Sequence, residues 1–203
     1  MKKLVALTAI TAALTVASGA EAFKSGWHAG ANFAYAKSTS KQEVKDTENK
    51  SYTFSGWSPV FTAEIKKTWI DCSTYKAVDA RLGWAFGKEK EETARLKEGM
   101  TAGIGFRYGT IMGETLLFGR LGLDANQQQF TYKFNGEQRK DTYFDYALAP
   151  GVGVEWEVAE GVGVELLYQY SMSFATRGYN DQDHKFSKTP SMHHIGVGVS
   201  WAI

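Results

Sequence analysis

Ten charged residues recur at strand spacing, and this spacing limits the chemistry they can do. In an extended strand, successive side chains point to opposite faces, so residues two apart share a face. The ten charges that fall on one set of faces are Glu64, Lys66, Asp79, Arg81, Arg107, Arg120, Asp124, Asp145, Glu155 and Glu165. Buried charges are tolerated when they are paired and hydrogen-bonded. The set therefore predicts an enclosed salt-bridge network, with glycines leaving room for the arginines.

Two serines and two histidines are the remaining candidates for catalysis. Ser171 and Ser173 end one expected strand at the rim where His193 and His194 begin the next, so a Ser–His pair is an open alternative. No short motif fixes their spacing. Adjacent strand residues face opposite ways, so the two histidines do not chelate one metal ion together. We expect no enzyme activity and no catalytic, cofactor or metal site.

Three further motifs suggest sites only weakly. GVGVE occurs at 151–155 and at 161–165, but a dinucleotide site requires a helix after its glycines, and here strand alternation continues. Asp181, Asp183 and His184 lack the glycine and terminal glutamate of a calcium loop. Cys72 is the only cysteine, so no internal disulfide forms and a passive turn position is expected.

The clearest element is a hairpin over 146–170. Its two strands, 146–156 and 162–170, have about the 9–11 residues that a tilted strand needs to cross hydrocarbon. One face is aromatic and aliphatic, whereas the other carries mainly glycine, alanine and carboxylates, which cannot fill a dry core. An apolar exterior around a polar interior is typical of a transmembrane β-barrel.

The rest of the chain repeats this pattern. Six further strands are expected at 26–36, 57–70, 75–87, 100–108, 114–125 and 193–203. Long polar loops are expected at 37–53, 88–98, 126–141 and 172–190, and the other three connections are short. Leu116 and Phe118 fall on the inner face, so we expect a bulge near Gly119 to correct their facing. The predicted fold is all-β, an eight-stranded antiparallel up-and-down barrel with both termini at the short-turn end.

Aromatic residues dominate the expected outer face, where they would meet lipid and form girdles near the strand ends. Lys67 interrupts this face near a strand end, from which its stem can reach the headgroups. The predicted lipid-facing aromatics are Trp27, Phe33, Tyr35, Trp69, Trp84, Phe86, Phe106, Tyr108, Trp156, Tyr168, Tyr170 and Trp201.

The N-terminus predicts export. Lys2 and Lys3 precede an apolar run that ends in an A-x-A cleavage site at 20–22, so we expect a signal peptide over 1–22 and a single barrel domain over 23–203. The apolar run is shorter than the ~20 residues of a spanning helix. Removing Lys2, Lys3 and Glu21 leaves 21 basic and 21 acidic residues, which gives no electrostatic basis for binding nucleic acid.

Two segments carry a family resemblance: PGVGVEWEVAEGVGVELLYQY at 150–170 and GVGVSWAI at 196–203. They resemble the penultimate hairpin and last strand of the opacity-type and OmpA/OmpX-like eight-stranded outer-membrane proteins, and the similarity in pattern covers essentially the whole mature chain. It implies a bacterial outer-membrane location, contact with lipid and lipopolysaccharide, and recognition of the last strand by the assembly machinery. Trp201 matches the aromatic residue expected two places before the end, whereas Ile203 departs from the aromatic final residue.

The expected function is that of a monomeric surface protein with a charge-plugged lumen. Envelope structure, adhesion or antigenicity would reside in the loops, which are free to bind an external ligand. Three alternatives remain open: a narrow pore for small solutes, a lipid-modifying enzyme, and a soluble periplasmic ligand-binding barrel.

Overall fold

The computed structural model describes residues 23–44, 50–91, 94–134, 137–177 and 184–203. These residues form one antiparallel sheet of nine strands, eight long and one short. In chain order they are β1 (Gly26–Val44), β2 (Lys50–Asp71), β3 (Thr74–Ala85), β4 (Lys88–Glu91), β5 (Ala94–Met112), β6 (Thr115–Phe134), β7 (Glu137–Ala159), β8 (Val162–Arg177) and β9 (His184–Ala202).

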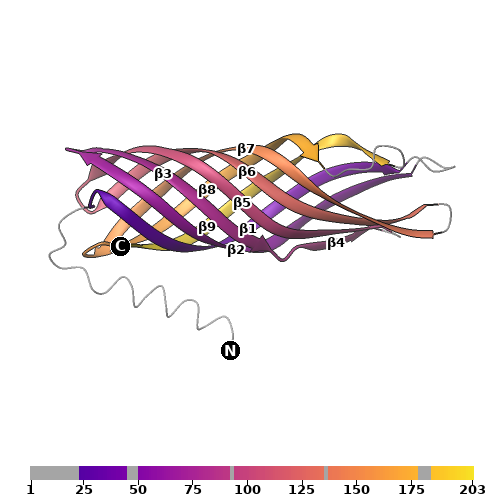
Figure 1. Ribbon diagram of the computed structural model, residues 1–203, viewed down its shortest axis with the longest axis horizontal. Helices are drawn as coiled ribbons and strands as arrows, with labels where there is room; N and C mark the ends of the chain where they lie inside the picture. The colour runs from indigo at the N-terminus through magenta and orange to yellow at the C-terminus, as the bar shows by residue number, and fades with distance from the viewer. Residues whose placement is uncertain (1–22, 45–49, 92–93, 135–136, 178–183) are drawn as a thin grey trace, which may run out of the picture.

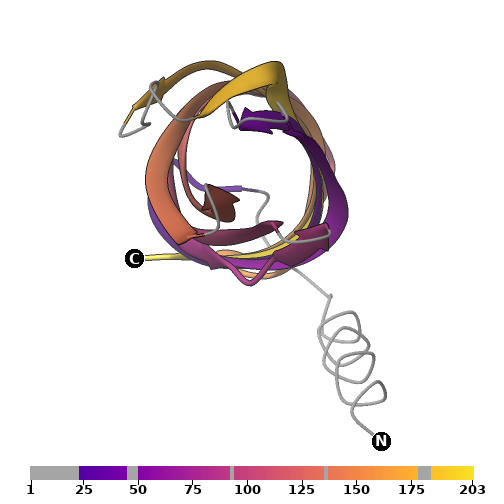
Figure 2. The ribbon, with the colours of Figure 1, turned by 90° about the vertical axis from the view of Figure 1, so that its right-hand side faces the viewer.

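The sheet closes on itself as a barrel. Each long strand pairs with its neighbours in the chain, β1 pairs with β9, and β3 pairs with β5. The short β4 follows β3 and continues the pairing along β5. Figure 2 shows the resulting ring, and Figure 1 shows its tilted strands, with the C-terminus at one end and β4 toward the other. The predicted eight-stranded barrel is confirmed, with β4 as an addition.

The outer surface of the barrel carries an apolar belt. Of the twelve predicted outward aromatics, eleven are exposed and Tyr170 is partly buried. Lys67 lies over the Trp27 ring, with its Nζ 5.4 Å from the ring centroid, in a cation–π arrangement near the end of β2. Within the described residues, no helix is long and apolar enough to span a membrane.

The predicted long loops are mostly wrong. Segments 37–53, 88–98, 126–141 and 172–190 consist largely of paired strand, so the sheet continues well beyond the apolar belt. Their outward residues are mainly polar where the structure describes them, while Tyr52, Phe54, Phe130 and Tyr132 point inward together with buried polar residues such as Gln42 and Gln128. This inward packing stabilises strands whose composition resembles that of loops.

The bulge expected near Gly119 is also wrong. The pairing of β6 with β5 and with β7 continues through Gly119 without a register shift. Leu116 and Phe118 are buried inside the barrel, where they pack with other apolar side chains. The irregularity in the β5–β6 ladder lies instead between Glu98 and Thr101.

The end of the barrel that carries the C-terminus has tight connections. The β2–β3 turn contains Cys72, which is exposed and has a positive φ of 53°, a conformation that fits its expected turn position. Gly113 and Gly161 adopt positive φ in the β5–β6 and β7–β8 turns, where glycine avoids the steric cost of a side chain.

Candidate functional site

The lumen is the candidate site, and it is filled in layers. Along β2, the inward residues run from aromatic near the external end, through Ser58, Val60 and Thr62, to charged residues and then threonine. β6 carries a corresponding series in the opposite direction. Inward residues on β6, from the short-turn end, are Leu116, Phe118, Arg120, Gly122, Asp124, Asn126, Gln128, Phe130 and Tyr132.

Arg107 on β5 lies at the centre of the charged layer and is fully buried. Its guanidinium donates to Asp79 on β3 at 3.0 Å, to Glu64 on β2 at 2.5 Å and to Glu165 on β8. Its cationic carbon also lies 5.0 Å from the Phe118 ring centroid. One side chain thus joins strands on different sides of the barrel, which is the arrangement that a buried cation requires.

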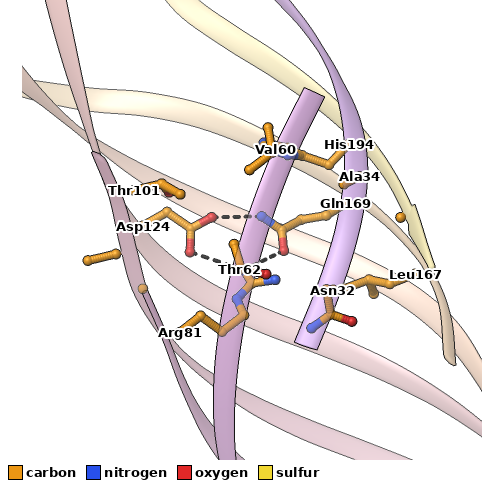
Figure 3. Close-up of a pocket in the computed structure, with 13 residues that line it drawn as sticks. Asn32, Ala34, Val60, Thr62, Arg81, Thr101, Asp124, Leu167, Gln169 and His194 are labelled. Atoms are coloured by element: carbon orange, nitrogen blue, oxygen red, sulfur yellow. Dashed lines mark hydrogen bonds and ion pairs between the residues drawn. The ribbon is translucent and has the colours of Figure 1, made fainter. Parts of the chain in front are cut away.

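Asp79 links this centre to a second arginine. Arg120 on β6 donates from Nη2 to Asp79 Oδ1 at 2.7 Å and from Nε to Oδ2 at 3.0 Å, a bidentate contact. Arg81 donates to Asp124 at 3.3 Å, and Gln169 bridges the arginines by accepting from Arg81 at 2.8 Å and from Arg120 at 3.0 Å. Figure 3 shows Arg81, Asp124 and Gln169 joined in this way.

Lys66 and Glu155 form a separate buried pair, with the Lys66 Nζ 2.7 Å from Glu155 Oε2. Ser200 on β9 donates to the other carboxylate oxygen at 2.7 Å. The structure thus brings nine of the ten predicted charges into contacts within the barrel. The tenth, Asp145, is also buried and lies nearer the external end.

Glycines provide the space for this network, as the sequence predicted. A Cβ on Gly105 would lie 2.5 Å from Arg120 Nη2, and one on Gly122 would lie 2.2 Å from its Nη1. A Cβ on Gly163 would lie 2.3 Å from Glu155 Oε1. Side chains at these positions would displace the charged groups from their partners.

Apolar clusters lie on both sides of the charged layer. Toward the short turns, a floor cluster is formed by Tyr75, Ala77, Leu116, Phe118 and Leu167, with Phe23, Ile70 and Ile111 packed against it. Toward the external end, a cap cluster is formed by Tyr52, Phe54, Ala94, Leu96, Phe130, Tyr132 and Tyr143. Phe130 and Tyr132 stack with ring centroids 4.9 Å apart. Ion passage would therefore require crossing two apolar layers and the charged layer.

Between the charged layer and the cap lies a cavity of about 50 Å³. Arg81, Asp124 and Gln169 line one side, and Asn32 and His194 are among the other lining residues (Figure 3). A cavity of this size holds a few water molecules. His194 Nε2 is buried without a hydrogen-bond partner among the described residues, so water is a suitable occupant.

The candidate catalytic residues are not assembled as a pair. Ser171 lies in the lumen and accepts a hydrogen bond from Gln169 at 3.2 Å, while His193 is exposed on the outer surface and contacts Tyr168 at 2.9 Å. His194 faces the lumen as Ser171 does, but its Nε2 has no hydrogen-bond partner among the described residues. His193 and His194 point to opposite faces, as predicted. In the described part of the chain, no group of three or more His, Cys, Asp or Glu side chains is placed to hold a metal ion. Asp181 and Asp183 lie outside the described residues.

Sequence reasoning missed several groups that complete the lumen. Gln169 bridges two arginines, a role that no motif in the sequence predicts. Glu98 was assigned to a loop, yet it is buried on β5. Glu89 on β4 lies nearby and accepts a hydrogen bond from Ser38 at 3.1 Å. The signal for these residues was alternation continuing through charged segments.

Comparison with known proteins identifies the architecture. Residues 6–202 match the family described as outer membrane protein beta-barrel domain. The fold is similar to that of the outer membrane protein AlkL, at 15% identity, 91% coverage of this chain, 93% of that chain and a TM-score of 0.51. It is also similar to Neisserial surface protein A, at 15% identity, coverages of 88% and 98%, and a TM-score of 0.49. For Ail, the attachment invasion locus protein of Yersinia pestis, the values are 13%, 87%, 99% and 0.45. Comparison with curated proteins finds no match.

Proposed function

Because the chain belongs to the outer membrane protein beta-barrel domain family, we propose that it is a closed barrel that supports the envelope and presents its external hairpins at the cell surface. The protein lies in the bacterial outer membrane, which rules out the soluble periplasmic alternative. The filled lumen is the observation that carries the proposal. Surface roles in adhesion or as an antigen belong to this proposal.

The closure of the lumen rests on more than one barrier. Arg107 alone joins β5 to β2, β3 and β8, so the charged layer is crosslinked across the barrel interior. The floor and cap clusters add desolvated apolar constrictions on either side. A hydrated ion that entered would lose water contacts without gaining free protein ligands, because these charges are already paired.

The external hairpins provide the surface that a partner would meet. β6 and β7 pair from the apolar belt out to Phe134 and Glu137, and their outward residues there are polar. The inward cap cluster holds these strands together, so the hairpin can present a fixed polar surface. We propose that an external ligand, where one binds, does so here, with the barrel acting as a monomer.

Lipid and assembly contacts follow from the outer face. The apolar belt is suited to the acyl chains of outer-membrane lipid and lipopolysaccharide. Trp201 and Ile203 are exposed at the end of the chain, where the assembly machinery would bind the last strand. We further propose that the protein is not an enzyme, since neither candidate serine is hydrogen-bonded to His193 or His194 among the described residues.

The test is solute entry into proteoliposomes that contain the purified, folded protein. We expect the wild-type barrel to allow no swelling in small sugars or amino acids, with insertion verified by heat-modifiable gel mobility. Replacing both Arg107 and Arg120 with alanine should raise leakage, whereas replacing the exposed Arg95 and Arg139 should not. Solute entry through the wild-type protein would contradict the closed barrel and favour the narrow pore.

Surface presentation is tested separately on intact cells. Proteases added outside should cut at the hairpin tips and leave the belt region protected. A deletion strain should show increased sensitivity to detergent or reduced adhesion to surfaces. If the hairpins are accessible only after the outer membrane is broken, the proposed orientation is wrong.

A further inference from the structure

Phe23, the first described residue, is hydrogen-bonded to the end of the barrel that carries the short turns. The backbone N of Phe23 donates to Glu157 Oε2 at 2.5 Å, although the two residues lie 134 positions apart. Glu157 is buried at the end of β7, and its other oxygen accepts from the backbone N of Gly161 at 2.9 Å. The Phe23 side chain packs against the floor cluster.

The next residues extend this attachment along the end of β2. The carbonyl oxygen of Lys24 accepts from Thr68 Oγ1 at 2.9 Å, and the backbone N of Gly26 donates to the same hydroxyl at 3.0 Å. Ser25 Oγ accepts from the backbone N of Ile70 at 2.8 Å. Residues 23–26 therefore lie in a defined position across the strand ends.

Glu157 lacks a cationic partner in this arrangement. Both of its hydrogen bonds come from backbone N–H groups, and no lysine or arginine of the described residues forms an ion pair with it. A buried carboxylate is much better stabilised by a positive charge that also donates hydrogen bonds. The group already facing it is the nitrogen of Phe23.

The backbone at Phe23 provides an independent reason to expect a chain end there. Its φ is 25°, in the left-handed half of the map that a bulky aromatic residue rarely adopts. The angle φ is defined by the preceding carbonyl carbon. Without that preceding residue, Phe23 keeps its place in the floor and the unfavourable torsion no longer exists.

We propose that the Ala22–Phe23 peptide bond is the processing site, and that the α-ammonium released on Phe23 pairs with Glu157 to fix the mature N-terminus in the barrel floor. An export-signal endopeptidase hydrolyses the bond. Water adds across it, Ala22 becomes the new C-terminal carboxylate, and the Phe23 nitrogen takes up the protons that make it an ammonium. The A-x-A residues at 20–22 precede this bond.

The first measurement is the intact mass of the protein extracted from outer membranes. We expect the mass of 23–203, with Phe23 at the N-terminus. A mature chain that begins at another residue would overturn the proposal.

The second measurement is the titration of the α-amine in the folded protein, using ¹³C-dimethylated amines and NMR. A free α-amine titrates near 7.7–8.0, and pairing with Glu157 should raise this pKa by about one pH unit or more. Glu157→Gln should return the pKa to the free value. Glu160→Gln is the control, because Glu160 is exposed and pairs with the Lys24 side chain instead.

Outcomes for poorly folding variants are also decisive. If Glu157→Gln fails to give the heat-modifiable folded band, Glu157→Asp and the wild-type titration decide the matter. An α-amine with the free pKa in wild-type protein overturns the proposal, as does one that Glu157→Gln leaves raised.

Discussion

At the residue scale, Arg107 is the group on which the charged layer depends. It is fully buried and meets carboxylates from three strands. Its guanidinium provides several donors in a rigid plane, which a lysine ammonium cannot reproduce. Removing such a group lowers the stability strongly, because its carboxylate partners would remain buried without a positive charge.

Arg107→Met should therefore be strongly destabilising. Removing one partner of a buried ion pair costs about 3–5 kcal/mol, and here Glu64, Asp79 and Glu165 all lose a donor. The measurement is the free energy of unfolding in urea, with the folded fraction read by gel mobility. Arg95→Met, on an exposed part of β5, should change stability by no more than about 0.5 kcal/mol. Equal effects of the two substitutions would contradict a central role for Arg107.

Glu98 gives the external extension a pH dependence. It lies on β5 beyond Met100, the last outward apolar residue on that strand, and its buried carboxylate faces the hydroxyls of Ser58 and Ser38. Burial raises the pKa of Glu98 above its ordinary value, and burial also raises the pKa of Glu89, with the charge of Glu98 adding to that increase. The folded state thus retains its protons more strongly than the unfolded state.

The sign follows from proton linkage. As pH rises from the ordinary glutamate pKa, near 4.3, the unfolded chain loses the proton first, so stability falls until Glu98 itself ionises. We expect residues 94–98 to exchange their amide hydrogens more slowly, after correction for intrinsic rates, at pH 5 than at pH 7. Glu98→Gln should slow exchange at pH 7 and flatten this difference, whereas the exposed Glu137→Gln should leave it unchanged. Faster exchange at pH 5 would refute the argument.

At the element scale, long strands such as β2 contain two opposite patterns. Within the belt, β2 places apolar residues such as Phe61 outward and charged residues such as Glu64 inward; beyond the belt, it places Tyr52 and Phe54 inward. The reason is a change of solvent along one strand. Hydrocarbon surrounds the belt, so apolar residues face outward there, while water surrounds the extension and the hydrophobic effect acts inward.

This inversion explains what the sequence could and could not reveal. Alternation correctly identified the closed sheet, its inner and outer faces and the charged set, because period two requires no knowledge of contacts. The strand ends were placed too early, since segments such as 126–141 carry polar outward residues that resemble a loop. Partner choice was also out of reach: Asp79 contacts Arg107 and Arg120 at once because the barrel cross-section brings β3, β5 and β6 together.

A charge on the belt tests the facing of β8. Leu166 is exposed on this strand, between Val197 of β9 and Val154 of β7. Leu166→Arg should reduce the unfolding free energy in lipid by about 2–4 kcal/mol if the position lies near the bilayer midplane. Gln138→Arg, outward on β7 beyond the belt, is the control and should be near neutral. Similar losses for both would place the membrane boundary elsewhere.

At the scale of the whole molecule, the floor, the charged layer and the cap stack along one axis inside a ring without free long edges. The order of the layers can be followed along one strand. β2 and β6 run in opposite directions, and their inward residues change from apolar to charged to apolar or polar in corresponding places. Each layer therefore draws residues from strands far apart in the chain.

The pairing of β1 with β9 has a consequence for biosynthesis. These are the first and last strands in chain order, and the backbone N of Ile203, just after β9, donates to the carbonyl oxygen of Trp27 at the start of β1. A chain that lacks β9 cannot close the ring, even if all its other strands are paired. Until β9 pairs with β1, the barrel keeps two unpaired strand edges, which are open to pairing with other chains.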